Sequence, residues 1–175
     1  MQNINGNYES AIPHHKKAVE LANKIEFKAF FLKNLGVTLS FLGRNEEAIE
    51  WYDRALEIKP DDSSSLRQKG VSLSELGRME EAIEWFDRAL EIKPDDWFSL
   101  VFKAFALESI GNNEEATQIF DFIASNEDKV KDKEIIAVVN FKKNALTEKE
   151  QDKKTDVLNE VINAFKRKKM TSSRI

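Results

Sequence analysis

A close internal repeat constrains this sequence more than any other feature. Leu42–Asp62 (LGRNEEAIEWYDRALEIKPDD) returns 34 residues later as Leu76–Asp96 (LGRMEEAIEWFDRALEIKPDD), and 19 of the 21 positions are identical. A 34-residue period with a helical pattern inside each unit predicts stacked helix pairs, in which each pair buries its apolar face against the next. We therefore expect an all-α repeat protein that binds a partner, and not an enzyme.

The composition agrees with a soluble, mostly helical chain. Of the 175 residues 33% are charged and 41% hydrophobic, with six Gly and three Pro, which suits one helical domain. There is no Cys, so disulfides, thiolate metal sites and a cysteine nucleophile are excluded. The first fifteen residues lack the pattern of a signal peptide, and no run of 18 apolar residues exists. We expect a cytoplasmic protein without a membrane span.

Glycine residues mark the frame of the repeat. Gly43, Gly77 and Gly111 lie 34 residues apart, and each is predicted to end the first helix of a pair in the left-handed conformation. Gly36 and Gly70 fall inside first helices, where glycine costs about 1 kcal/mol relative to alanine. Because this cost recurs at the repeat period, we predict a close approach of two helices at both positions.

The periodic residues resemble the signature of the tetratricopeptide repeat family. The first unit matches it at Leu32, Leu35, Gly36, Leu39, Ala48, Tyr52, Ala55 and Pro60. The second unit matches at Leu66, Gly70, Leu73, Ala82, Phe86, Ala89 and Pro94, and the third keeps Leu100, Ala104, Leu107, Ala116 and Phe120 before it departs. The resemblance implies an all-α, right-handed superhelical solenoid of antiparallel helix pairs, with about nine helices, that acts as a protein-interaction scaffold.

The frame divides the chain into six segments: an incomplete N-terminal repeat that holds only a second helix, two full repeats, a degenerate repeat, an atypical helix pair that caps the stack, and a disordered tail. In that order they span residues 1–28, 29–62, 63–96, 97–128, 129–170 and 171–175. Gly6 is assigned to the turn before the N-terminal helix. The capping pair is expected at residues 134–146 and 147–170.

In stacks of this kind the first helices line the concave side. By helical spacing ten residues are assigned to this groove, namely Phe30, Lys33, Val37, Phe41, Arg67, Val71, Phe98, Val101, Phe102 and Phe105. The first helix of the third unit (WFSLVFKAFALESI) is apolar almost all round, which is typical of a helix that is covered on every side. Two occupants stay open: an amphipathic helix or extended peptide from a partner protein, or the chain's own C-terminal helix.

One branch of the family grips a C-terminal carboxylate with Lys, Asn and Arg side chains from several first helices. Only Lys33 stands in register for that role, because Val37, Gln68, Phe98 and Phe102 occupy the other positions. A carboxylate clamp needs several convergent donors, so we reject this ligand. Lys33 and Arg67 are interpreted as solvated charges at the groove edge, with contact to an acidic partner as the alternative.

The other patterns indicate no further chemistry. His14 and His15 are adjacent, so they face different sides of a helix and cannot chelate a metal together. We expect no catalytic residue, no metal and no cofactor. The basic run Lys166–Lys169 lacks interleaved aromatic residues, which makes nucleic acid an unfavoured partner. The expected partner is a protein or peptide, and self-association through the N-terminal end is the alternative.

Overall fold

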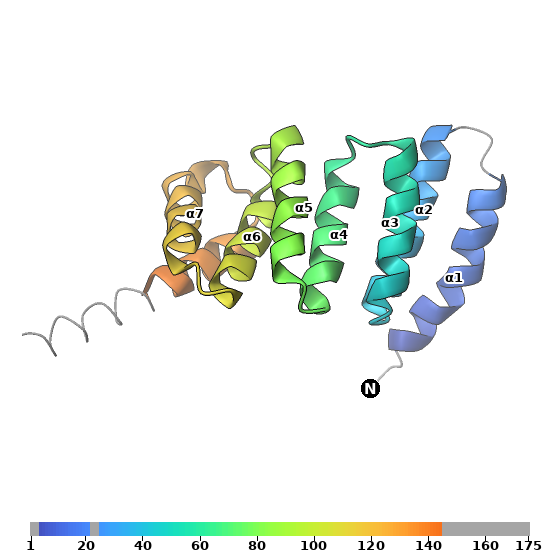
Figure 1. The fold of residues 1–175 in the computed structure, drawn as a ribbon, viewed down its shortest axis with the longest axis horizontal. Coiled ribbons are helices and arrows are strands. Elements are labelled where there is room, and N and C mark those ends of the chain that lie inside the picture. The colour runs from blue at the N-terminus through green and yellow to red at the C-terminus, as the bar shows by residue number, and fades with distance from the viewer. Residues whose placement is uncertain (1–3, 22–24, 145–175) are drawn as a thin grey trace, which may run out of the picture. The chain divides into compact units, whose positions relative to one another are not determined.

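The computed structural model of the chain describes residues 4–21 and 25–144, and within these ranges it contains helices and no strand (Figure 1). The α-helices are α1 (Ile4–Leu21), α2 (Ile25–Phe41), α3 (Asn45–Ile58), α4 (Ser63–Glu75), α5 (Met79–Ile92), α6 (Trp97–Ser109) and α7 (Asn113–Ser125). A short 3-10 helix η1 (Glu127–Lys129) and a helical stretch over residues 133–144 follow. The all-α fold is confirmed, whereas the expected helix at 147–170 lies outside the described residues.

The chain forms two compact units, residues 1–119 and residues 120–175. In the first unit, consecutive helices lie side by side and antiparallel (Figure 1). The pairs α2 with α3 and α4 with α5 are the two full repeats. The helices α2, α4 and α6 are first helices, and α4 contacts both of the others. These three parallel helices form the wall on which the candidate site is built.

The turns after the first helices have the predicted glycine geometry. Gly43, Gly77 and Gly111 have φ angles of 75°, 77° and 84°, which only glycine adopts without strain. After α2 the amide of Arg44 donates to the carbonyl of Leu39 at 2.9 Å, as in a Schellman motif. The expectation for Gly6 is wrong. This glycine lies inside α1, which begins at Ile4, so no turn is needed there.

The close approach predicted at the two helical glycines is also present, and its partner is an aromatic ring. A Cβ atom on Gly36 would lie 2.6 Å from Cε1 of Tyr52, and one on Gly70 would lie 2.6 Å from Cε1 of Phe86. Both rings are fully buried. Each glycine therefore lets the second helix of its repeat place a large ring against the backbone of the first helix.

Ion pairs at the repeat period join the first helices α4 and α6 to the second helices that precede them. The ammonium of Lys69 on α4 pairs with Asp53 on α3 and lies 3.7 Å from the centre of the Trp85 ring. One period later, Lys103 Nζ on α6 lies 2.8 Å from an oxygen of Asp87 on α5. Lys69 is buried, so this lysine and its carboxylate help to hold consecutive repeats together.

Candidate functional site

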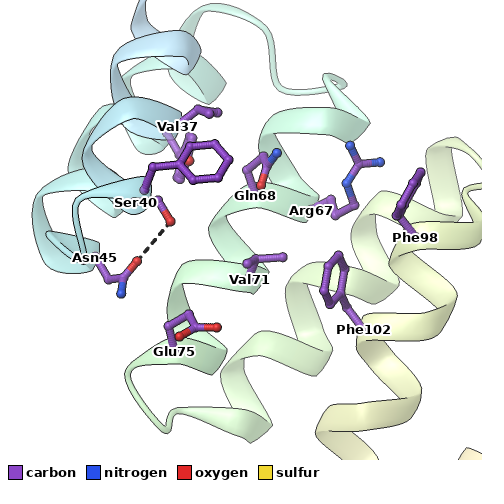
Figure 2. Close-up of a pocket in the computed structure, with 12 residues that line it drawn as sticks. Val37, Ser40, Asn45, Arg67, Gln68, Val71, Glu75, Phe98 and Phe102 are labelled. Carbon is purple, nitrogen blue, oxygen red and sulfur yellow. Dashed lines mark hydrogen bonds between the residues drawn. The ribbon is translucent and has the colours of Figure 1, made fainter. Parts of the chain in front are cut away.

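A pocket of about 560 Å³ lies where α2, α4 and α6 adjoin (Figure 2). Nine of its lining residues come from these three helices: Val37, Ser40 and Phe41 on α2, Arg67, Gln68, Val71 and Glu75 on α4, and Phe98 and Phe102 on α6. Gly43, Asn45 and Tyr52 complete the lining from the turn after α2 and from α3. The pocket thus draws on the first helices of three successive repeats.

Six of the ten residues assigned to the groove from sequence line this pocket: Val37, Phe41, Arg67, Val71, Phe98 and Phe102. Phe30 and Lys33 lie earlier on α2, outside the lining, and Phe105 is half-buried on α6 outside it. Val101 needs a correction, because its side chain is only 7% exposed. The lining residues of α6 are four positions apart, and Val101 lies between them and points into the core.

Much of the apolar lining consists of exposed aromatic rings, two of which stack on other aromatic rings of the chain. Phe41, Phe98 and Phe102 are 64%, 43% and 37% exposed. Phe41 stacks on Tyr8 of α1 with ring centres 5.1 Å apart, and Phe102 stacks on the buried Phe86 with centres 6.1 Å apart. These contacts restrict the rings before any ligand arrives, which lowers the entropy cost of binding.

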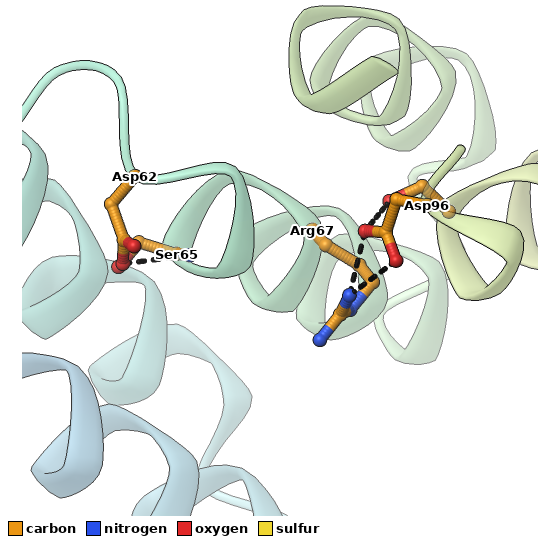
Figure 3. A network of polar contacts seen from close by, with 5 residues as sticks. Asp62, Ser65, Arg67 and Asp96 are labelled. Carbon is orange, nitrogen blue, oxygen red and sulfur yellow. Dashed lines mark hydrogen bonds and ion pairs between the residues drawn. The ribbon is translucent and has the colours of Figure 1, made fainter. Parts of the chain in front are cut away.

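The basic residues of the groove are paired within the chain. Arg67 Nη1 donates to both carboxylate oxygens of Asp96, at 2.8 and 2.6 Å (Figure 3). One period earlier, Lys33 Nζ lies 3.3 Å from an oxygen of Asp62. The interpretation of Lys33 and Arg67 as solvated charges is therefore wrong. Each cation ties its first helix to the start of the next one.

Both acidic partners also stand at a helix N-terminus. Asp62 caps α4, and one of its oxygens accepts hydrogen bonds from the Ser65 amide at 3.2 Å and the Ser65 hydroxyl at 2.5 Å (Figure 3). Burial alone would raise the pKa of Asp62, but these hydrogen bonds and the charge of Lys33 lower it below its usual value. Asp96 occupies the same place at α6 and accepts from the Ser99 hydroxyl at 2.7 Å.

A chain of polar groups runs beneath one end of the pocket. The Ser72 hydroxyl donates to Ser40 Oγ at 3.2 Å. Ser40 in turn donates to Oδ1 of Asn45 at 3.1 Å (Figure 2). The buried Tyr52 hydroxyl has no hydrogen-bond partner among the described residues. Burial raises the pKa of Tyr52 well above its usual range.

Glu75 provides a second charge in the lining. It is the last residue of α4 and is exposed. Arg67, Val71 and Glu75 are spaced four apart, so they follow one face of the helix (Figure 2). Within the described ranges Glu75 makes no ion pair or hydrogen bond through its side chain. The α4 face therefore runs from a paired cation through an apolar residue to an unpaired carboxylate.

Sequence reasoning did not assign Ser40, Gln68 or Glu75 to the groove, nor the residues contributed from outside the first helices. On α4 it assigned Arg67 and Val71, whereas the pocket continues by a further step of four to Glu75. A stricter helical spacing would have found Glu75. No sequence signal indicated Tyr52, because its ring reaches the pocket only through the space that Gly36 leaves.

Other kinds of site are not found in the described residues. In residues 4–21 and 25–144 no group of three or more His, Cys, Asp or Glu side chains is arranged to hold a metal ion. None of the helices in the same ranges has the length and hydropathy needed to cross a membrane.

Comparisons with known proteins agree with this architecture. Two family models, each described as a tetratricopeptide repeat, match residues 2–61 and 63–96. No curated protein sequence matches the chain.

Solved structures share the fold at low sequence identity. MamA has a TM-score of 0.61 and 23% identity, over 71% of this chain and 72% of its own. YrrB, described as a TPR protein with an unusual peptide-binding site, has a TM-score of 0.58 and 22% identity, over 67% of this chain and 59% of its own. The first TPR of Spaghetti (RPAP3), bound to the HSP90 peptide SRMEEVD, has a TM-score of 0.60 and 18% identity, over 69% of this chain and 94% of its own. At these identities the likeness establishes the fold alone.

Proposed function

Since the chain belongs to the tetratricopeptide repeat family, whose members are non-enzymatic scaffolds for protein interactions, we propose that its pocket binds an apolar segment of a partner protein. The segment, a short helix or extended peptide, lies along α4 between α2 and α6. Its apolar side chains pack against the rings that line the pocket. The residues of the groove, and not the repeated residues of the scaffold, select which segment binds.

The observation that carries this proposal is the exposure of Phe41, Phe98 and Phe102 around one pocket. Exposure of apolar rings to water is unfavourable. Covering these rings with an apolar group of a partner therefore lowers the free energy of the complex. YrrB and the RPAP3 repeat domain are described as peptide-binding or peptide-bound, and the same mode of binding is proposed for this chain.

A labelled synthetic peptide tests the proposal. The probe, here named the Q-peptide, is an amphipathic peptide of about twelve residues with Leu and Phe at helical spacing and Gln elsewhere. Binding is followed by fluorescence anisotropy with the full chain, with a Phe98→Ser/Phe102→Ser variant, and with Phe141→Ser as control. Phe141 is 71% exposed and lies outside the pocket.

The double variant is expected to lose at least tenfold in affinity. A tenfold loss corresponds to about 1.4 kcal/mol of binding free energy, and burial of two aromatic rings contributes more than that. The Phe141→Ser variant should bind as the parent does. Equal affinity of all three proteins, or equal losses in the two variants, would show that the peptide binds elsewhere.

The alternative occupant is the chain's own segment 147–170, which was expected to be helical and lies outside the described residues. It predicts that a chain truncated after residue 146 binds the Q-peptide more tightly than the full chain, whereas our proposal predicts equal affinity. Self-association through the N-terminal end predicts a sedimentation coefficient that rises with concentration and stops rising when residues 1–28 are deleted. Neither result is expected for a groove that binds a separate partner.

A further inference from the structure

We infer that the partner segment is cationic, with apolar residues for the aromatic rings and a Lys or Arg side chain that reaches Glu75. This inference rests on the proposed function, because it names the chemistry of the segment that the same pocket takes. Three observations carry it: the internal pairing of the basic residues, the unpaired carboxylate at one end of the pocket, and the charge of the unit.

An acidic segment finds in the pocket only a cation whose charge is already balanced within the chain. Arg67 is the one basic residue of the described lining, and both oxygens of Asp96 already hold its Nη1. Lys33, farther along α2, is paired with Asp62. An acidic ligand at Arg67 would meet a guanidinium whose charge Asp96 already balances, and it would either lie beside that carboxylate and be repelled by it or have to displace it. Asp96 is also almost fully buried, so its displacement would leave a carboxylate without its counter-ion.

A basic side chain, in contrast, meets an unpaired anion at the other end of the pocket. Glu75 is exposed and is the last residue of α4. The C-terminal end of a helix carries the negative end of its dipole, and α2 runs parallel to α4, so its end at Phe41 lies on the same side. A Lys or Arg placed here would be favoured by the carboxylate and by two helix ends together.

The wider charge of the first unit acts in the same direction. Residues 1–119 contain 14 Lys and Arg and 21 Asp and Glu, a difference of −7. A negative surface raises the association rate of cationic segments and opposes anionic ones, and the effect weakens as salt increases. The local and the overall electrostatics therefore favour the same class of partner.

Three matched peptides test the inference on the full chain. They share the Leu and Phe positions of the Q-peptide and differ only in their polar positions, which are all Gln, all Lys (K-peptide) or all Glu (E-peptide). The variants are Glu75→Gln and, as control, Glu80→Gln. Glu80 is an exposed residue in the first turn of α5 that lies outside the pocket, so both substitutions remove one negative charge. Circular dichroism verifies that each variant is folded.

We expect the K-peptide to bind more tightly than the Q-peptide and the E-peptide more weakly. The Glu75→Gln variant should lose about three- to tenfold in K-peptide affinity, as expected for one charged contact at a partly screened site. Its effect on the Q-peptide, which has no charge opposite Glu75, should be smaller than its effect on the K-peptide, and Glu80→Gln, outside the pocket, should change neither affinity.

Two results would overturn the inference: equal affinity for the K- and E-peptides, or equal effects of Glu75→Gln and Glu80→Gln on the K-peptide. With either result, binding of the Q-peptide that depends on Phe98 and Phe102 would still support the proposed function. If none of the three peptides binds, both the inference and the proposed function fail.

Discussion

Arg67 donates two hydrogen bonds from Nη1 to Asp96, at 2.8 Å to one carboxylate oxygen and 2.6 Å to the other. The pair joins the middle of α4 to the residue that caps α6, and Lys33 and Asp62 repeat the relationship between α2 and α4. Because 34 residues separate both the cations and the anions, the pair belongs to the repeat. The basic residues along the groove therefore tie consecutive repeats together, and our proposal assigns selection of the partner to the residues that differ between repeats.

The Arg67→Ala substitution should cost much more stability than Lys33→Ala. The side chain of Asp96 is only 4% exposed, whereas that of Asp62 is 22% exposed. Loss of Arg67 leaves a buried carboxylate with Ser99 as its side-chain donor, at a cost of about 1–3 kcal/mol, against about 0–1 kcal/mol for the more exposed pair. Urea unfolding of the two variants measures the difference. Equal losses would contradict this ranking.

Gly70→Ala should destabilise the chain by about 1–3 kcal/mol, although alanine favours helix by about 1 kcal/mol. The new Cβ would lie 2.6 Å from the Phe86 ring, so the buried ring must move. The cost should fall when Phe86 is also changed to Leu, because the smaller side chain leaves room. Thermal unfolding of both single variants and the double variant measures this coupling. Additive effects would show that the glycine is not required by the ring.

The Tyr52→Phe substitution should stabilise the chain by about 1 kcal/mol, since it removes a buried hydroxyl that has no hydrogen-bond partner among residues 4–21 and 25–144. The second repeat provides the reverse experiment. It has Phe86 at the equivalent position and Ala106 in place of Ser72, so Phe86→Tyr should destabilise by about 1–3 kcal/mol. Urea midpoints of the two variants should move in opposite directions. A loss of stability in Tyr52→Phe would indicate that the hydroxyl is satisfied.

The stability of the chain should fall in acid partly through Asp62. The folded-state pKa of Asp62 lies below its usual value of about 3.9, so the unfolded chain takes up the proton first as the pH falls. The stabilisation is complete above the unfolded pKa and is lost as the pH falls through the folded pKa. Asp62→Asn keeps a capping oxygen and removes the charge, so its urea midpoint should fall less between neutral pH and about pH 3.

The exposed neighbour Asp61 provides the control for this experiment. An Asp61→Asn variant changes the net charge by the same amount, but Asp61 makes no ion pair or side-chain hydrogen bond in the described structure. It should follow the parent chain in acid. If Asp61→Asn flattened the pH dependence as much as Asp62→Asn does, overall charge and not the pair with Lys33 would be the cause.

The sequence predicted the scaffold well because the scaffold is what repeats. The left-handed conformation of Gly43 and the close approach at Gly36 follow from residue types that recur at 34-residue spacing. The expectation for Gly6 failed because no copy of the repeat supports it, and α1 simply continues through that position. The repeat period therefore predicts the conformation of a residue only where an equivalent residue recurs at the same spacing.

The candidate site was predicted less completely, because it depends on contacts between repeats. Spacing along a helix placed Phe98 and Phe102 on the groove, but it could not show that Asp96 neutralises Arg67, which lies 29 residues away. Nor could it show that Val101 faces the core. Ion pairs between helices can be identified only once the packing of the helices is known. In the structure they neutralise the two cations assigned to the groove and leave Glu75 as the unpaired charge of the described pocket lining.

A titration that observes the valine methyl groups tests the central claim most directly. Val37 and Val71 line the pocket, whereas Val130 and Val139 are buried in the second unit. The full chain, labelled at its valine methyls, is titrated with the K-peptide and followed by NMR. We predict that the Val37 and Val71 signals shift and saturate while those of Val130 and Val139 stay unchanged. Saturable shifts confined to Val130 and Val139 would contradict the assignment of the binding site to the pocket of α2, α4 and α6.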